Sequence, residues 1–125
     1  MDLYSENILH HFKNPSHKGQ LDNADTQALE HNPSCGDKIE VQLKLDSNNK
    51  VTEAMFDGIG CAISQAAASM LTEKLIGKTL EEVSKIPNDE VYKMLGIEIS
   101  PGRVKCALLS LVAAKSAAHN HKKDA

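Results

Sequence analysis

Two stretches in the first half of the chain alternate between apolar and polar residues, which is the pattern of half-buried β-strands. Along 38–45 one face carries the apolar side chains of Ile39, Val41, Leu43 and Leu45. A turn at 46–50, rich in Asn and Asp that tolerate left-handed backbone, leads into a second strand at 51–59. On that strand the residues expected to face inward are Val51, Met55 and Ile59. A weaker signal predicts a short strand at 26–31.

Helical spacing of apolar residues flanks these strands on both sides. A first helix is predicted over 3–13 and ends before Asn14-Pro15, since the residue before proline avoids the helical region. After the strands, residues 62–76 are small or straight-chained and are closed by Gly77. Two shorter helices are expected next, one opened by a capping box from Thr79 to Glu82 and one over 89–95 capped by Asn88.

The last helix is predicted to start at Ser100-Pro101, because proline favours the first helical position. Its inward stripe is expected to comprise Val104, Ala107, Leu108, Leu111, Val112 and the stem of Lys115. Residues 119–125 are expected to form a polar tail after a single domain over 1–118. The order of elements indicates an α+β fold: a small antiparallel sheet of about three strands, with an N-terminal helix and C-terminal helices packed on one face.

Composition narrows the function classes. The chain has 125 residues, a net charge of −3 and an ordinary hydrophobic fraction of 41%. The negative charge argues against a nucleic-acid partner bound through overall positive charge, and no apolar run approaches the roughly 20 residues that a membrane span needs. The N-terminus carries acids where a signal peptide has bases. We therefore expect a cytoplasmic protein with neither a nucleic-acid nor a membrane partner.

The three cysteines are the candidates for chemistry, and an odd count in a reducing compartment does not favour disulfides. Buried free cysteine as core filler is the plain alternative. However, Cys35 lies in a loop before Gly36 and Asp37, Cys61 lies between a strand and a helix, and Cys106 lies early in the last helix. A fold that gathers these ends would bring together three thiolates and one carboxylate, a set suited to Zn²⁺ or to iron in a cluster.

Four segments resemble the family of IscU, SufU and NifU N-terminal proteins, and together they extend over nearly the whole chain. They are Tyr4…Ile8-Leu9-His10-His11-Phe12-Lys13-Asn14-Pro15, Asn32-Pro33-Ser34-Cys35-Gly36-Asp37, Phe56-Asp57-Gly58-Ile59-Gly60-Cys61-Ala62-Ile63-Ser64 and Arg103-Val104-Lys105-Cys106-Ala107-Leu108. The resemblance implies a role in iron–sulfur cluster assembly, in which a cysteine desulfurase supplies sulfur. It also implies that the ligands of the metal or cluster are Cys35, Asp37, Cys61 and Cys106.

Two functions within this family fit the residues. The first is a non-enzymatic scaffold that binds iron, receives sulfur, and assembles and transfers clusters of the [2Fe-2S] type to apo-protein acceptors. The second is a zinc-dependent sulfur relay of the SufU type, and Zn²⁺ is expected in the purified protein under either reading. Lys105 stands where the IscU branch has histidine, as in SufU, whereas the interval between Cys61 and Cys106 is too short for the extra segment of the SufU branch. A structural zinc domain is a third alternative, disfavoured by the carboxylate of Asp37.

For sulfur acceptance, Cys106 is the predicted persulfide acceptor and Cys61 the alternative, because a nucleophilic thiolate is required. Arg103 lies three residues before Cys106 and on the same helix face, so it is expected to support the thiolate electrostatically. The histidines at 10–11 and 119–121 are expected to have structural or surface roles. A homo-oligomer is compatible with the sequence.

Overall fold

The computed structural model describes residues 6–33, 36–96 and 98–124, without the side chains of Asn7 and 122–124. Three strands and the helices around them follow in the order α1 (Glu6–Lys13), β1 (Thr26–Asn32), β2 (Asp37–Leu45), β3 (Val51–Ile59), α2 (Ala62–Leu75), α3 (Leu80–Ser84), α4 (Asn88–Leu95), the 3₁₀ turn η1 (Pro101–Arg103) and α5 (Val104–Asp124). The predicted α+β class is confirmed. The predicted first helix is described from Glu6 onward, and its first three predicted residues lie outside the described ranges.

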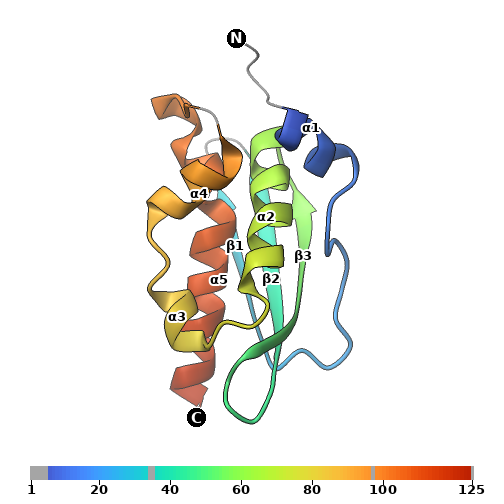
Figure 1. The fold of residues 1–125 in the computed structure, drawn as a ribbon, viewed down its shortest axis with the longest axis vertical. Helices are drawn as coiled ribbons and strands as arrows, with labels where there is room; N and C mark the ends of the chain where they lie inside the picture. Colours follow the sequence, from blue (N-terminus) through green and yellow to red (C-terminus); the bar gives the residue numbers. More distant parts are fainter. Residues whose placement is uncertain (1–5, 34–35, 97, 125) are drawn as a thin grey trace.

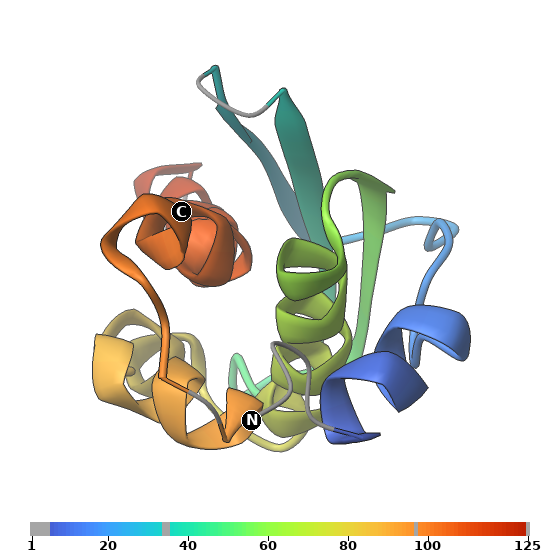
Figure 2. The same ribbon diagram turned by 90° about the horizontal axis from the view of Figure 1, so that it is seen from above.

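The strands form one antiparallel sheet in the order β1-β2-β3 (Figure 1). Helices α2 and α5 lie side by side on one face, with α5 over β1 and β2 and α2 over β3. Seen from above, α1 flanks α2, and α3 and α4 form an outer layer against α2 and α5 (Figure 2). The helices therefore bury one face of the sheet, as the sequence predicts.

The core lies between the sheet and the pair α2 and α5. The predicted alternation on β2 is confirmed, since Ile39, Val41 and Leu43 are fully buried. The helices bring mostly small residues to this layer, including Ala66, Ala67 and other alanines of α2 and α5. Small side chains allow two helices to approach the sheet closely, which explains how a chain with few aromatic residues forms a compact core.

The predicted inward face of β3 is wrong beyond its first residue. Val51 is buried, but the next buried residues are Ala54 and Phe56, while Met55 is half-buried and Ile59 is exposed. The register shifts between Lys44 and Leu45 of β2, which leaves Thr52 as an extra residue in β3. Such a bulge reverses the alternation of every later side chain, because the side-chain period of a strand is two.

The outer edge of β3 is covered by the segment that follows α1. The backbone N–H of Gly19 donates to the Phe56 carbonyl at 2.9 Å, and the Phe56 N–H donates to the His17 carbonyl at 2.9 Å. The same segment continues onto the open face of the sheet, where the Leu21 N–H donates to Gln42 Oε1 at 2.6 Å. Consequently β1 forms the other edge of the sheet.

The last helix differs from its prediction in two respects. Its inward stripe is rotated: Leu109 is buried, whereas Val112 is 46% exposed. The rotation follows from the packing of α5 against both β1 and α2, which buries alanines that a single apolar stripe does not include. The helix also continues through the segment expected as a polar tail and ends at Asp124.

The remaining boundaries agree with the sequence to within a residue or two. The capping box between Thr79 and Glu82 is present in full, and Gly96 closes α4 in the left-handed conformation. Asn88 is not the cap of α4, since Pro87 takes that position and its carbonyl accepts the Glu90 N–H at 3.0 Å. Among the described residues, no helix is both long and apolar enough to cross a membrane.

Candidate metal centre

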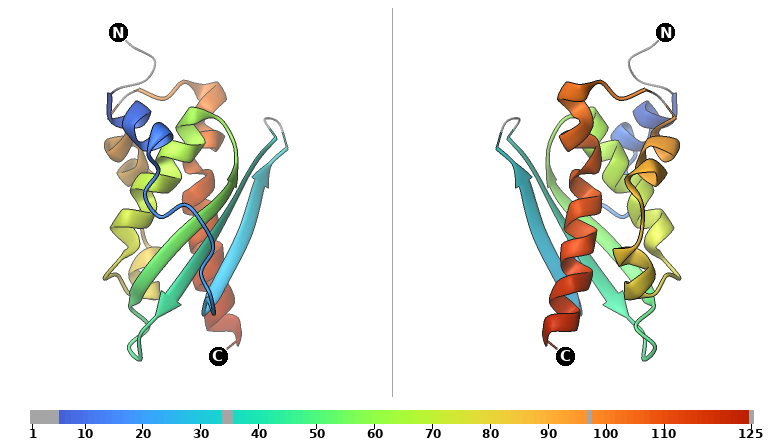
Figure 3. Two further views of the ribbon diagram at one scale, coloured as in Figure 1. Left: turned by 90° about the vertical axis from the view of Figure 1, so that its right-hand side faces the viewer. Right: turned by 90° about the vertical axis from the view of Figure 1, so that its left-hand side faces the viewer.

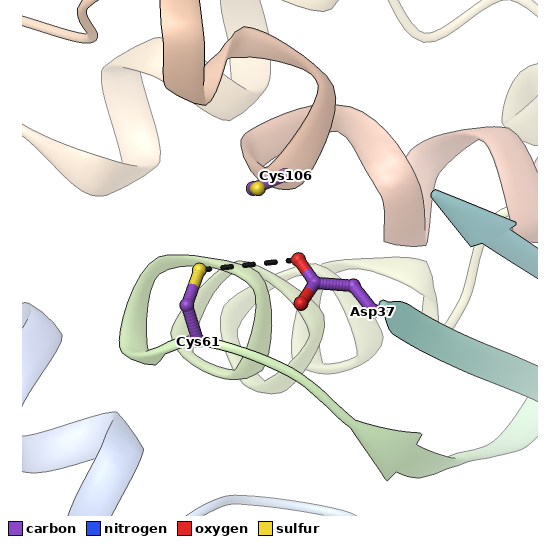
Figure 4. A group of neighbouring side chains, drawn as sticks. All are labelled: Asp37, Cys61 and Cys106. Atoms are coloured by element: carbon purple, nitrogen blue, oxygen red, sulfur yellow. Dashed lines mark hydrogen bonds between the residues drawn. The ribbon is translucent and has the colours of Figure 1, made fainter. Parts of the chain in front are cut away.

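Three of the four predicted ligand residues meet at one end of the sheet. Asp37 begins β2, Cys61 joins β3 to α2, and Cys106 lies in the first turn of α5. One carboxylate oxygen and the two sulfurs lie within 4.8 Å of one another, and Cys61 Sγ is 4.0 Å from Asp37 Oδ2. Figure 4 shows the three side chains directed into a common space from three different elements. The fourth predicted ligand, Cys35, lies outside the described residues.

The three donors differ in their access to solvent. Asp37 is 3% exposed and Cys106 is 1% exposed, while Cys61 is half-buried. All three line an open pocket of about 470 Å³, and the other lining residues are Gly36, Ile59, Gly60, Gly102 and Arg103. The donors are thus held by the protein core but face a space that an ion and a further ligand can enter.

Gly60 is the residue that lets Asp37 and the start of α2 approach each other. A Cβ at this position would lie 2.2 Å from Ser64 Oγ and 3.1 Å from the Asp37 carboxylate. Gly58 permits a similar approach one step earlier, because a Cβ there would lie 1.9 Å from the Lys38 carbonyl oxygen, and its φ is +140°. Gly60 therefore allows close packing around the Asp37 carboxylate, and Gly58 allows the close approach of β3 to the backbone of β2.

The backbone of Cys61, rather than its thiol, takes part in starting α2. Cys61 is the N-cap residue and makes no side-chain capping hydrogen bond. Its carbonyl accepts the Gln65 N–H at 3.0 Å and the Ser64 hydroxyl at 3.1 Å. Because these bonds use only the carbonyl, the sulfur remains directed toward Asp37 and Cys106.

Asn32 is a residue of the site to which the sequence analysis assigned no role. Its side-chain amide donates to Cys106 Sγ at 3.9 Å, and both residues are buried. The contact joins the end of β1 to the first turn of α5. The signal was present in the Asn32-Pro33 start of the second motif, but nothing in a single sequence shows that this amide reaches a sulfur 74 residues later.

The two cations nearest Cys106 in the sequence line different pockets. Arg103 borders the pocket of the three donors. Lys105 borders a separate groove between β1 and α5, together with Val104, Leu108 and Val112. Arg103 is therefore placed to act on the donors through space, whereas Lys105 faces another surface.

Two sulfurs and one carboxylate oxygen form a donor set that fits a thiophilic metal. Zn–S bonds are about 2.3 Å long, so the donors of one bound ion would lie somewhat closer together than the 4.8 Å found here. A tetrahedral ion would still have one position for a further ligand. The geometry thus suits an ion or cluster that is held by few protein ligands and is accessible from solvent.

The predicted structural role of the N-terminal histidines holds for His11, whose Nδ1 lies 2.7 Å from the buried Ser69 hydroxyl. His119 and His121 belong to no group of potential metal ligands among the described residues, where Asp37, Cys61 and Cys106 form the one such group.

Comparison with known proteins shows to which family the chain belongs. The sequence model of the family described as the NifU-like N-terminal domain matches residues 3–125. The chain belongs to this family. Family membership agrees with the resemblance carried by the four sequence segments, which is thereby confirmed.

The relatives of the chain include proteins with two different names. An iron–sulfur cluster assembly scaffold protein IscU from Haemophilus influenzae is 35% identical over 122 residues, covering 95% of each chain. A zinc-dependent sulfurtransferase SufU from Bacillus subtilis is 38% identical over 125 residues, covering 86% of this chain and 84% of the relative. A crystal structure from Fervidobacterium islandicum, described as a putative scaffold protein for the SUF system, has a TM-score of 0.76 and 31% identity, covering 92% of this chain and 96% of that one.

Proposed function

We propose that this protein is an iron–sulfur cluster assembly scaffold, which binds iron, receives sulfur and passes the finished cluster to apo-proteins. The observation that carries the proposal is the grouping of one carboxylate oxygen and two sulfurs within 4.8 Å around an open pocket. The IscU relatives and the family match support it. On this proposal the protein acts as a binding platform rather than as an enzyme, and the cluster is its cargo.

The ligand roles follow from the chemistry of the donors. Cys61 and Cys106 would hold iron through soft thiolates, and Cys35 would complete the set. Asp37 would supply a hard oxygen that binds a soft centre less strongly. A site with one such ligand releases its cargo more readily than a site with four thiolates, which suits transfer better than permanent storage.

For sulfur delivery we assign Cys106 as the acceptor of persulfide sulfur from a cysteine desulfurase, with Cys61 as the alternative. In this step the Cys106 thiolate attacks the outer sulfur of the desulfurase persulfide, and the desulfurase cysteine leaves as a thiolate. Arg103 borders the pocket of the donors and would favour the approach of the two anionic groups. Lys105 borders a different groove and supports this step less.

A zinc-dependent sulfur relay is the second candidate function. The observations that favour it are the relative named as a zinc-dependent sulfurtransferase and the lysine before Cys106. Such a relay uses the same donors to hold one Zn²⁺, so the donor geometry alone does not separate it from a scaffold.

Metal content distinguishes the two functions. The full chain is purified without oxygen, supplied with iron, cysteine and a cysteine desulfurase, and measured for iron, acid-labile sulfide, zinc and visible absorbance. A sulfide-to-iron band with acid-labile sulfide, lost in Cys61→Ser, supports the scaffold. Stoichiometric zinc that iron does not displace, with no acid-labile sulfide, overturns the scaffold in favour of the relay.

The assignment of the sulfur acceptor has its own test. Persulfide loading by a desulfurase is read by mass spectrometry on wild type, Cys106→Ser, Arg103→Ala and Lys105→Ala. We expect Cys106→Ser to lose loading and Arg103→Ala to reduce its rate more than Lys105→Ala. Equal rates in both cation variants and wild type would remove the electrostatic role of Arg103.

A further inference from the structure

The edge of the sheet formed by β1 carries backbone groups that point away from the sheet. The hydrogen bonds of Phe56 with His17 and Gly19 show that its N–H and C=O point away from β2. These directions alternate along each strand, and the register relates Phe56 to Val41 and Val41 to Ala28. It follows that the backbone groups pointing outward from β1 belong to Gln27, Leu29 and His31.

One side-chain contact agrees with this direction. The Asn120 side chain, from the far end of α5, donates to the outward carbonyl of Gln27 at 3.4 Å. Within the described residues no helix or strand lies beyond β1, which forms the margin of the molecule in both views of Figure 3. An edge strand of this kind is a template for pairing with another strand.

Apolar side chains lie on both sides of the same edge. Leu29, at the middle of β1, is 57% exposed on the open face of the sheet. On the helix side, Leu108 and the exposed Val112 line a groove of about 320 Å³ beside Glu30 and His31. An added strand would therefore gain backbone hydrogen bonds and cover apolar surface at once.

The sequence of β1 is complementary to itself. Antiparallel pairing centred on Leu29 joins every outward residue to an outward residue: Leu29 to Leu29 and Gln27 to His31. Glu30 then lies opposite Ala28, so no like charges face each other. A register centred on Glu30 would set two carboxylates in opposition, and a register centred on Ala28 would set Gln27 against the apolar Leu29.

We propose that β1 is a dimerisation strand, which pairs antiparallel with β1 of a second copy of this chain about a two-fold axis at Leu29. The dimer contains one continuous six-stranded sheet. Asn32, at the metal-centre end of β1, pairs with position 26 of the other copy, so the two metal centres lie at opposite ends, about 20 Å apart along the strands. Each copy keeps its own donor set.

The position at the two-fold axis allows a charge-swap experiment. In Leu29→Lys and in Leu29→Glu, two like charges face each other at the axis, and each variant alone is expected to be monomeric. An equimolar mixture of the two variants opposes Lys to Glu and is expected to restore a dimer. The masses are measured by sedimentation equilibrium of the full chain from micromolar to millimolar concentration, under reducing conditions that exclude disulfide-linked pairs.

The control is Ile76→Lys, which places the same charge on an exposed apolar residue at the end of α2 and is expected to stay dimeric. Circular dichroism and zinc stoichiometry per chain check that each variant is folded and retains its metal centre. A monomeric wild type at every concentration overturns the proposal. So does a dimer that Leu29→Lys leaves intact, or a mixture of the two charge variants that stays monomeric.

Discussion

The side-chain amide of Asn32 donates to the sulfur of Cys106 at 3.9 Å, across the contact between β1 and α5. Both partners are buried, so water does not compete for this hydrogen bond. On the proposed function Cys106 is a ligand, and the Asn32 amide would then orient its sulfur and offset the negative charge of the thiolate.

The first prediction concerns this amide. Asn32→Leu keeps the side-chain volume roughly constant but removes the donor, and it should lower the affinity for Zn²⁺ by about 10- to 100-fold. Competition with a coloured chelator measures the affinity. The matched control is Asn120→Leu, which removes another amide contact between α5 and β1 far from the sulfur. Equal affinities in the two variants would show that the Asn32 amide does not support the Cys106 thiolate.

The second prediction concerns the hard ligand. Asp37→Ala removes the carboxylate and leaves the thiolates, so cluster loss to a chelator should become several-fold slower than in wild type. Decay of the visible absorbance gives the rate. Asp57→Ala is the control. Asp57 lies in β3 near the end of the sheet where Asp37 begins β2, but its carboxylate accepts hydrogen bonds from Gly58 and Gln20 instead. Faster loss from Asp37→Ala would contradict the argument from ligand hardness.

The third prediction compares two glycines that line the same pocket. Gly60→Ala places a Cβ against Ser64 and Asp37, whereas a Cβ at Gly102 meets no atom within 4 Å. Gly60→Ala should therefore destabilise the fold by roughly 1–3 kcal/mol, and Gly102→Ala should have a much smaller effect. Urea denaturation measures both.

A second substitution separates the two contacts of that Cβ. Ser64→Ala removes the atom at 2.2 Å but leaves the carboxylate at 3.1 Å. The double variant Gly60→Ala/Ser64→Ala should recover part of the lost stability and retain the part caused by the contact with the Asp37 carboxylate. Full recovery of the stability would mean that the Asp37 carboxylate does not need the space that Gly60 leaves.

The fourth prediction concerns pH. The backbone N–H of Thr79 and then its hydroxyl lower the pKa of Glu82 below its ordinary value of 4.5. A carboxyl with a lower pKa in the folded state stabilises the fold above its unfolded pKa, and this contribution is lost as the pH falls through the folded pKa. The difference in unfolding free energy between wild type and Glu82→Gln should be constant near neutral pH and shrink below about pH 4.5. A difference that grows with acid would contradict the sign of the shift.

The sequence predicted most of the fold because its signals are local. Alternation on β2, the capping box at Thr79 and the glycine after α4 each depend on a few neighbouring residues. The predicted facing of β3 failed because the bulge at Thr52 arises from pairing with β2, which one strand alone does not reveal. The rotation of α5 has a similar origin, since two neighbours rather than one decide which of its residues are buried.

For the metal centre, sequence motifs indicated the four candidate ligands, and the structure describes three of them in one group. Which of these side chains bind metal stays a prediction. The role of Asn32 and the separation of Arg103 from Lys105 required the packing of β1 against α5, because they depend on distances between residues remote in the chain.

The bulge at Thr52 determines which residues of β3 face the core, so the number of residues that follow it matters for the fold. Pairing with β2 without the bulge, but with Thr52 retained, would turn Glu53 and Met55 toward the core in place of Ala54 and Phe56. Deleting Thr52 itself would remove the bulge and leave Ala54 and Phe56 facing the core. A change of length by one residue between the bulge and Cys61 would reverse the facing of the strand residues on one side of that change.

The turn at 46–50 precedes the bulge, so a change in its length does not alter which residues of β3 face the core. Its Asn49 carbonyl accepts the Leu80 N–H at 3.0 Å, so the turn also contacts the start of α3. In engineered or related chains, insertions near this hairpin should therefore concentrate in the turn, while the part of β3 that follows Thr52 keeps its number of residues.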